Sequence, residues 1–268
     1  MSQIASGQVS TSAAEIYEEF YLPALFLEWA PRMAAAAGVG PNQRVLDVAC
    51  GTGVLARALA ERVKPRGAVT GLDINEGMLA VARRKAPEID WRHGAAEALP
   101  FADGSFDVVA SQFALMFFQD RAKAIGEMLR ALRPGGRLAV AVWDSLDRTP
   151  AYRAFVGLLD RLFGAGTAEA LRSPFVLGDT RGLAALFRDG GAPDVEIVTH
   201  EGTGRFPSVE SWVFTDVKGW TAADLIDDDG YQRLLVEAKR ELRPFVAPDG
   251  AVTFVMPAHI VTATKPRH

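Results

Sequence analysis

An apolar segment that breaks into a glycine-rich turn constrains the fold of this chain more than any other feature. Residues 44–49 read Arg-Val-Leu-Asp-Val-Ala, which is typical of a buried strand, and Cys-Gly-Thr-Gly follows at 50–53. An Ala/Leu/Arg-rich stretch over residues 54–63 then predicts a helix. A glycine turn between a strand and a helix N-terminus lets a ligand approach the backbone and offers it free N–H groups. The pattern therefore predicts a nucleotide-like ligand at the crevice of an α/β sheet.

Strand and helix signals alternate through the first 143 residues. Apolar runs predict strands over 44–49, 68–72, 89–92, 107–110 and 138–143, with helices over 54–63, 75–86 and 120–132. Alternating elements of this length favour a parallel sheet with right-handed crossovers. After Trp143 helical patterns dominate, and strand-like runs are confined to 195–199 and 251–264.

We predict one enlarged domain rather than two. The chain has 268 residues, which exceeds a typical domain of about 150 residues, yet it contains no internal repeat and no low-complexity linker. The predicted division is an N-terminal helical cap over 1–40, a ligand-binding core over 41–143, helical insertions over 144–180 and 202–249, and segments over 181–201 and 250–268 that complete the sheet.

The balance of charge argues against a nucleic-acid partner. Lys and Arg number 29 against 33 Asp and Glu, a net charge of −4 that lacks the basic surplus a phosphate backbone requires. No uninterrupted apolar stretch in the sequence approaches the 18 residues expected of a membrane span. Since Cys50 is the single cysteine and the first residues lack an export signal, we expect a reducing, cytoplasmic setting.

A single carboxylate separates two interpretations of the glycine turn. Residues 51–56 fit the dinucleotide pattern Gly-x-Gly-x-x-Ala, and Asp73 follows 22 residues after Gly51, where such folds keep a ribose-binding acid. This match leaves an NAD-dependent oxidoreductase open. Asp47, however, stands within the apolar strand, where a carboxylate is costly unless a cation or several donors satisfy it. It would repel a pyrophosphate and attract the ammonium or sulfonium end of S-adenosylmethionine.

Four motifs follow one another in order through residues 40–143. They are VLDVACGTG at 45–53, GLDIN at 71–75, EALPFADGSFDVV at 97–109 and LRPGGRLAVAVW at 132–143. On these motifs the chain resembles the class I S-adenosylmethionine-dependent methyltransferases, specifically the ubiquinone/menaquinone C-methyltransferase-like small-molecule group. The resemblance implies a Rossmann-like α/β fold with a seven-stranded, mostly parallel sheet, one antiparallel strand near the edge and helical insertions forming a cap. It also implies S-adenosyl-L-methionine as the cofactor.

The resemblance also assigns cofactor-binding positions. It places Asp47, Gly51, Thr52, Gly53, Ser111 and Gln112 beside the methionine part, Asp73 at the ribose hydroxyls, and Ile74 and Met78 against the adenine. In the family pattern an Asp follows Gly94 and holds the adenine amine, whereas Ala95 stands at that position here. We expect backbone groups of Ala95 and Ala96 to serve the adenine edge instead.

The acceptor side is less defined by the sequence. Amino-methyltransferases that act on nucleobases or glutamine usually carry an Asn/Asp-Pro-Pro-aromatic motif after the fourth strand, and the apolar run 113–118 replaces it here. We therefore expect a small hydrophobic acceptor, methylated at oxygen, carbon or a non-nucleic nitrogen. The N-terminal helical segment and the insertions after Trp143 would cover this acceptor.

Methyl transfer from a sulfonium needs mainly alignment and desolvation, so a dedicated base is optional. The candidate catalytic residues are Tyr17 and Tyr21 of the N-terminal helix, and His200 and His259 near the predicted edge strands. We expect no metal, since the acidic run 227–229 has the spacing of a solvated charge cluster. A protein that binds an adenosyl ligand without methylating anything remains a further alternative.

Overall fold

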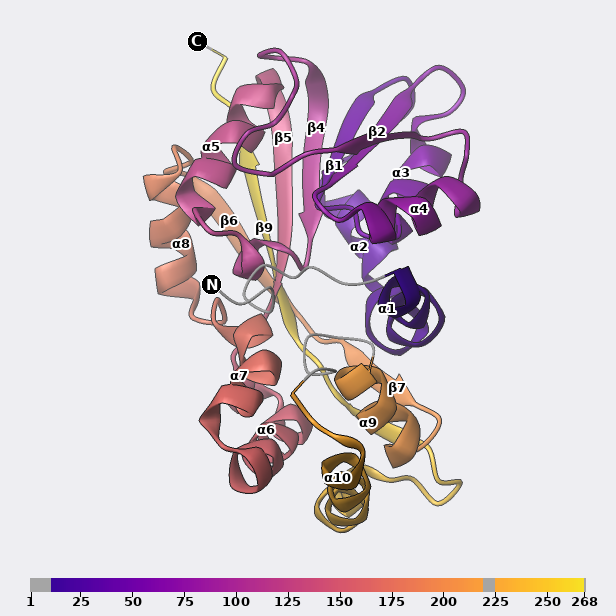
Figure 1. Cartoon of the computed structure of the whole chain (residues 1–268). Helices are drawn as coiled ribbons and strands as arrows, with labels where there is room; N and C mark the ends of the chain where they lie inside the picture. Colours follow the sequence, from indigo (N-terminus) through magenta and orange to yellow (C-terminus); the bar gives the residue numbers. More distant parts are fainter. Residues whose placement is uncertain (1–10, 219–224, 268) are drawn as a thin grey trace.

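The central element of the structure is a seven-stranded sheet, seen in a computed structural model that describes residues 11–218 and 225–267 (Figure 1). Its strands lie in the order β3-β2-β1-β4-β5-β9-β6. Their bounds are β1 Arg44–Val48, β2 Ala68–Asp73, β3 Asp90–His93, β4 Phe106–Gln112, β5 Leu132–Trp143, β6 Val195–His200 and β9 Ala258–Thr264. β1 pairs in parallel with β2 and β4, whereas β9 runs antiparallel to β5 and β6. The predicted mostly parallel sheet with one antiparallel strand is confirmed.

Helices cover both faces of this sheet because its central strands are apolar on both sides. All of residues 45–48 of β1 and 138–143 of β5 are buried. α2 (Trp29–Ala36) packs against α3 (Val54–Val63), and α5 (Arg121–Ala131) packs against α8 (Thr180–Asp189). The alternation of strands and helices predicted up to Trp143 is thus confirmed.

Side-chain caps precede three helices, and two of them, at Asn75 and Asp120, lie where the sequence predicts a helix to begin. Asn75 precedes α4 (Glu76–Lys85), Asp120 precedes α5 and Asp179 precedes α8. In each case the side-chain oxygen accepts a hydrogen bond from a backbone N–H two or three residues later, which satisfies a donor of the first helical turn. Two of these caps, at Asn75 and Asp120, also border the cavity described below.

A second group of helices, with a two-stranded ribbon, gathers beyond one end of the sheet (Figure 1). It comprises α6 Pro150–Phe163, α7 Ala165–Arg172, α9 Val209–Lys218, α10 Asp228–Glu241 and a ribbon of β7 Thr203–Phe206 with β8 Val252–Val255. We call this group the cap. The insertion 202–249, expected to be helical, therefore also contains β7. The strand-like run 251–264 is divided into β8 and β9 around Pro257, which has no N–H to give to a ladder.

The N-terminal helical segment lies between α4 and the cap (Figure 1). It consists of α1 (Thr11–Ile16), the π-helix η2 (Tyr17–Phe26) and then α2. Pro23 lies inside η2 and cannot donate to a regular α-helical ladder, a usual cause of such irregularity. α1 packs on α4 while η2 packs beside β7 and α9, so this segment joins the sheet domain to the cap. Within the described ranges, no helix has both the length and the apolarity to cross a membrane.

Candidate cofactor and acceptor site

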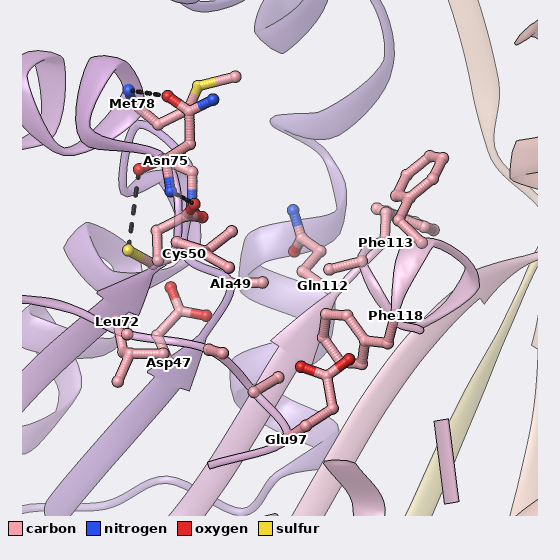
Figure 2. A pocket seen from close by; sticks show the side chains of 18 of the residues that line it. Asp47, Ala49, Cys50, Leu72, Asn75, Met78, Glu97, Gln112, Phe113 and Phe118 are labelled. Atoms are coloured by element: carbon pink, nitrogen blue, oxygen red, sulfur yellow. Dashed lines mark hydrogen bonds between the residues drawn. The ribbon is translucent and has the colours of Figure 1, made fainter. Parts of the chain in front are cut away.

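A cavity of about 470 Å³ opens where β1, β2, β3 and β4 end (Figure 2). Residues at the ends of these strands and in the segments that follow them line it, namely Asp47, 49–51, 72–75, 94–97 and 112–114, together with Tyr17, Val54, Leu55, Met78, residues 117–120 and Lys123. β2 and β4 lie on opposite sides of β1, so the direction of winding reverses at this point of the sheet. Open α/β sheets bind their ligands at such a reversal.

The glycine turn after β1 gives the cavity its open floor. Gly51 has φ +55°, and no protein atom lies within 4 Å of the position that a Cβ would take there. Gly53 has φ +90°, but its Cβ would lie 2.4 Å from the ring of Trp91. Gly51 therefore borders the space for a ligand, whereas Gly53 permits close packing beneath the turn. Thr52, between them, is buried and does not line the cavity.

Asp73 ties the glycine turn to the start of α4. Its Oδ2 accepts a hydrogen bond from the backbone N–H of Gly51 at 2.8 Å, and its Oδ1 accepts one from Asn75 at 2.8 Å. Burial raises the pKa of Asp73, while these backbone donors oppose the rise. The carboxylate lines the cavity, so it both fixes the local backbone and presents acceptor oxygens to a ligand.

Asp47 is a buried carboxyl group whose desolvation costs free energy in the folded protein. Its side chain is 1% exposed, and its Oδ2 has no hydrogen-bond partner among the described residues. Burial raises its pKa to about 8; a backbone hydrogen bond from Ala56 counteracts this, and the nearby charge of Asp73 adds to it. An unpartnered acceptor that faces a cavity is satisfied by a cation or a donor from a ligand. The site thus fits the positively charged methionine part of S-adenosylmethionine.

One side of the cavity is apolar and fits a flat heterocycle. Met78 is buried there, and Ile74 is 48% exposed. Gly94, Ala95 and Ala96 form the adjoining wall, so the two residues expected to contact the adenine edge, Ala95 and Ala96, line the cavity.

Glu97 closes this side and was not singled out by the sequence. Its Oε1 accepts a hydrogen bond from the backbone N–H of Gln119 at 2.9 Å. The carboxylate therefore bridges the segment after β3 to the segment before α5 instead of turning freely into the cavity. Its position in the short segment that follows the parallel strand β3 is the signal that could have identified it.

Aromatic side chains form the opposite wall (Figure 2). Phe113, Phe117 and Phe118 line the cavity after β4. Phe113 has φ +56°, an uncommon conformation for a bulky residue, and its ring stacks on Trp143 with centroids 3.7 Å apart. The strained backbone at Phe113 places an aromatic ring at the cavity edge.

The two polar residues at the end of β4 are divided by the pleat of the strand. Gln112 lines the cavity with its Oε1 buried and lacking a hydrogen-bond partner in the part of the chain that is described. Ser111 is fully buried behind the wall and does not line the cavity. The structure thus brings Gln112, but not Ser111, to the ligand space.

The four candidate catalytic residues lie in different places. Tyr17 lines the cavity, while Tyr21 lies one turn further along η2 and donates a hydrogen bond to Asp216. His200 ends the edge strand β6 away from the cavity. His259 is buried in β9, where its Nδ1 lies 2.8 Å from Thr199 Oγ1 and its Nε2 lies 3.0 Å from the Gly178 carbonyl. Of the four, only Tyr17 borders the ligand space.

The chain is similar in sequence to known methyltransferases. Residues 46–140 match the family model described as a methyltransferase domain. The demethylmenaquinone methyltransferase of Renibacterium salmoninarum is 46% identical over 146 residues, which are 54% of this chain and 60% of the relative. The demethylmenaquinone methyltransferase of Listeria welshimeri is 34% identical over 194 residues, 66% of this chain and 82% of the relative.

The fold is also that of solved methyltransferases. Phosphoethanolamine N-methyltransferase 2 of Haemonchus contortus, solved with S-adenosylhomocysteine, superposes with a TM-score of 0.60 at 19% identity over 96% of this chain and 57% of that one. At this identity the likeness concerns the fold alone. Together with the sequence relatives and the ordered strand-end residues of the cavity, it identifies the family. The chain belongs to the class I S-adenosylmethionine-dependent methyltransferases, in the group that includes the demethylmenaquinone methyltransferases.

Proposed function

We propose that this protein transfers the methyl group of S-adenosylmethionine to a small, apolar, ring-containing acceptor. The observation that carries the proposal is the continuity of one cavity from the acidic strand ends at Asp47 and Asp73 to the aromatic wall of Phe113, Phe117 and Phe118. A cationic cofactor fits the acidic end, and an apolar acceptor fits the aromatic end. The demethylmenaquinone methyltransferases among its relatives favour a quinol or a similar aromatic ring carrying hydroxyl groups.

The proposed cofactor contacts follow from which side chains border the cavity. Asp47, Gly51 and Gln112 would hold the methionine part, Asp73 the ribose hydroxyls, Ile74 and Met78 the adenine faces, and Ala95 and Ala96 its edge. Thr52, Gly53 and Ser111 lie outside the cavity lining, so we assign them to the support of the turn and of β4. The buried and unpartnered Asp47 Oδ2 supports this arrangement, because only a ligand or solvent group can satisfy it.

The contribution of the protein to methyl transfer would be alignment and exclusion of water. When bound, S-adenosylmethionine supplies an activated methyl group on a sulfonium centre. The aromatic wall orients an acceptor ring and lowers the local polarity, which favours a reaction that disperses charge. Tyr17 faces the same cavity, and burial raises the pKa of its hydroxyl above the ordinary value. Tyr17 therefore stays protonated and serves as a hydrogen-bond donor rather than as a base.

The remaining parts of the chain would have supporting roles. We propose that residues 41–143 bind the cofactor, and that the N-terminal segment and the insertions 144–180 and 202–249 enclose the acceptor. A small molecule rather than a nucleic acid is the partner that a net charge of −4 supports. A cytoplasmic setting belongs to the same proposal, supported by the single, buried and unpaired Cys50.

The proposal is tested by single-turnover methyl transfer. Enzyme loaded with S-adenosylmethionine carrying a deuterated methyl group is mixed with a panel of quinols, catechols, phenols and aliphatic amines, and products are read by mass spectrometry. We expect label on one of the hydroxylated rings and none on the amines. Replacing Phe118 by Ser should lower this transfer while leaving S-adenosylhomocysteine affinity within about twofold, because Phe118 lies on the acceptor wall.

Two results would contradict the proposal. Label on amines alone would exclude the aromatic acceptor. Tight S-adenosylhomocysteine binding with no transfer to any panel member would favour the alternative of a protein that binds the adenosyl ligand without methylating. An NAD-dependent oxidoreductase would instead bind NAD in a competition titration, which we do not expect since a pyrophosphate would lie against Asp47.

A further inference from the structure

A further buried carboxylate lies in the cap, away from the cavity. Asp216 of α9 is 1% exposed, and three aromatic side chains donate hydrogen bonds to it. Its Oδ1 accepts from Tyr21 at 2.6 Å and from Tyr152 at 3.3 Å, and its Oδ2 accepts from Trp212 Nε1 at 2.7 Å. The donors come from η2, α6 and α9, so one carboxylate joins three elements.

The Asp216 cluster separates two groups of packed rings. On the cap side, Tyr152 and Trp212 pack on each other and on Phe254 of β8. On the other side, the ring of Tyr21 lies 5.6 Å from that of Tyr17, which lines the cofactor cavity. Tyr17 also packs on a small cluster that includes Met78 of α4. The hydroxyl of Tyr21 thus forms a polar link between the cap and the helix that carries Tyr17.

Burial of a carboxylate here is not explained by stability alone. Burial raises the pKa of Asp216 to about 7, and the three donors oppose but do not cancel this rise. Apolar side chains of similar volume would fill the same space without the desolvation cost. What a carboxylate with three donors adds is a defined orientation of each donor, because a displaced partner leaves a buried acceptor unsatisfied.

We propose that Asp216 is a positioning residue for cofactor binding, because it holds η2 against the cap through Tyr21 and thereby keeps Tyr17 on the wall of the cofactor cavity. The two tyrosines lie on one turn of a π-helix that contains Pro23, which gives the segment little α-helical regularity of its own. Anchoring from outside the segment therefore decides where Tyr17 lies. The inference concerns the site of the proposed methyl transfer and extends it to a residue that does not touch the ligand.

The test compares two tyrosines that donate to the same carboxylate. Tyr21→Phe and Tyr152→Phe each remove one hydroxyl from Asp216 and retain the ring. We expect Tyr21→Phe to weaken S-adenosylhomocysteine binding about fivefold and to raise the KM for S-adenosylmethionine to the same extent, with kcat changed less than twofold. Tyr152→Phe should leave both affinities within twofold although it lowers the melting temperature, because its ring belongs to the cap and not to η2.

Two substitutions of Asp216 itself test whether a polar side chain at this position is required for cofactor affinity. Asp216→Leu should reproduce the loss of affinity seen for Tyr21→Phe. Asp216→Asn should bind S-adenosylhomocysteine with an affinity close to that of the wild type. The amide oxygen can accept from Trp212 while the amide nitrogen donates to the tyrosine hydroxyls. Amide hydrogen exchange over η2 should be faster in Tyr21→Phe and unchanged in Tyr152→Phe.

The inference is overturned if Tyr152→Phe weakens cofactor binding as much as Tyr21→Phe, or if all variants change only the melting temperature. Binding of S-adenosylhomocysteine requires neither an acceptor nor turnover. An absence of methyl transfer with the expected affinity pattern would therefore count against the proposed acceptor and not against the role of Asp216.

Discussion

At the scale of single residues, the most informative position is a carboxylate in an apolar strand. The sequence alone identifies Asp47 as an anomaly, because an isolated Asp between Leu46 and Val48 has no local partner. The structure adds that one of its oxygens lies unpartnered among the described residues. In contrast, the bond between Tyr21 and Asp216 joins residues 195 positions apart, and no local pattern indicates it.

The pKa of Asp47 predicts a pH dependence of cofactor binding. In the folded protein this pKa is raised from 3.8 to about 8, so the group is mostly protonated below pH 8. A cationic ligand favours the carboxylate and lowers the pKa, so binding releases a proton below about pH 8. Affinity for S-adenosylmethionine should therefore rise by up to roughly tenfold per unit between pH 6 and 8 and level off above.

Calorimetry in buffers of different ionisation enthalpy measures this proton release. Asp47→Asn should bind more weakly at pH 8 and lose most of the pH dependence, whereas Asp216→Asn serves as the control and should retain it. Equal proton release by the wild type and by Asp47→Asn would show that another group is titrating.

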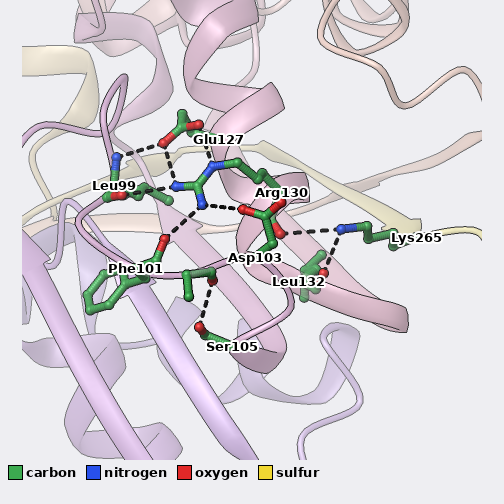
Figure 3. Close-up of polar contacts among 9 residues, drawn as sticks. Leu99, Phe101, Asp103, Ser105, Glu127, Arg130, Leu132 and Lys265 are labelled. Atoms are coloured by element: carbon green, nitrogen blue, oxygen red, sulfur yellow. Dashed lines mark hydrogen bonds and ion pairs between the residues drawn. The ribbon is translucent and has the colours of Figure 1, made fainter.

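At the scale of elements, the segment between β3 and β4 shows how structure outside the cavity shapes it (Figure 3). Arg130 of α5 donates to the carbonyls of Leu99 and Phe101 and pairs with Asp103 and Glu127. The other oxygen of Glu127 accepts from the Leu99 backbone N–H at 2.8 Å. These contacts hold residues 99–103 on α5, and with them the preceding turn 94–97 that lines the cavity.

Removal of the Arg130 contacts, which we call the Arg130 clamp, should affect both the stability of the fold and the affinity for the cofactor. We expect Arg130→Met to lower the free energy of unfolding by about 1–3 kcal/mol, because two carbonyls and two carboxylates lose a charged donor. We also expect it to weaken S-adenosylhomocysteine binding several-fold. Arg133→Met is the matched control, since Arg133 pairs with Asp107 at a more exposed position and should cost less than about 1 kcal/mol. Urea unfolding and calorimetry measure the two effects, and equal losses for both variants would refute the clamp.

Some strands and helices can be predicted from local sequence patterns, and others cannot. Buried parallel strands such as β1 are continuous apolar runs, and helix starts such as those at Asn75 and Asp120 have local caps, so both are predictable. The strand β7 has four residues and pairs with β8, with Thr203 opposite Val255 and Phe206 opposite Val252. A strand of that length has too few alternations to be distinguished from a loop. The π-helical form of η2 is likewise set by Pro23 together with tertiary packing.

At the scale of the whole molecule, the reversal of winding beside β1 unites the predicted cofactor residues. The residues that follow β1, β2, β3 and β4 extend from Ala49 to Ala114 in the sequence, yet they border one cavity because the strands are parallel neighbours. Once the strand order is inferred, this part of the site is predictable. The acceptor side depends on the packing of the N-terminal segment and the cap, whose contacts are long-range, so the sequence defines it far less.

The measurement that tests the central claim most directly is titration of S-adenosylhomocysteine into Gly51→Ala. A Cβ at Gly51, which lines the cavity, meets no protein atom within 4 Å. The substitution therefore clashes with no protein atom, and its cost to the folded protein is the backbone strain of an alanine at φ +55°. Gly104→Ala is the control, since Gly104 has φ +68° and ordinary contact distances but lies outside the cavity. Both variants should lose a similar stability of about 1 kcal/mol.

If the strand-end cavity holds the cofactor, Gly51→Ala binds S-adenosylhomocysteine at least tenfold more weakly than the wild type, while Gly104→Ala binds it with unchanged affinity. Wild-type affinity in a folded Gly51→Ala variant would contradict the account.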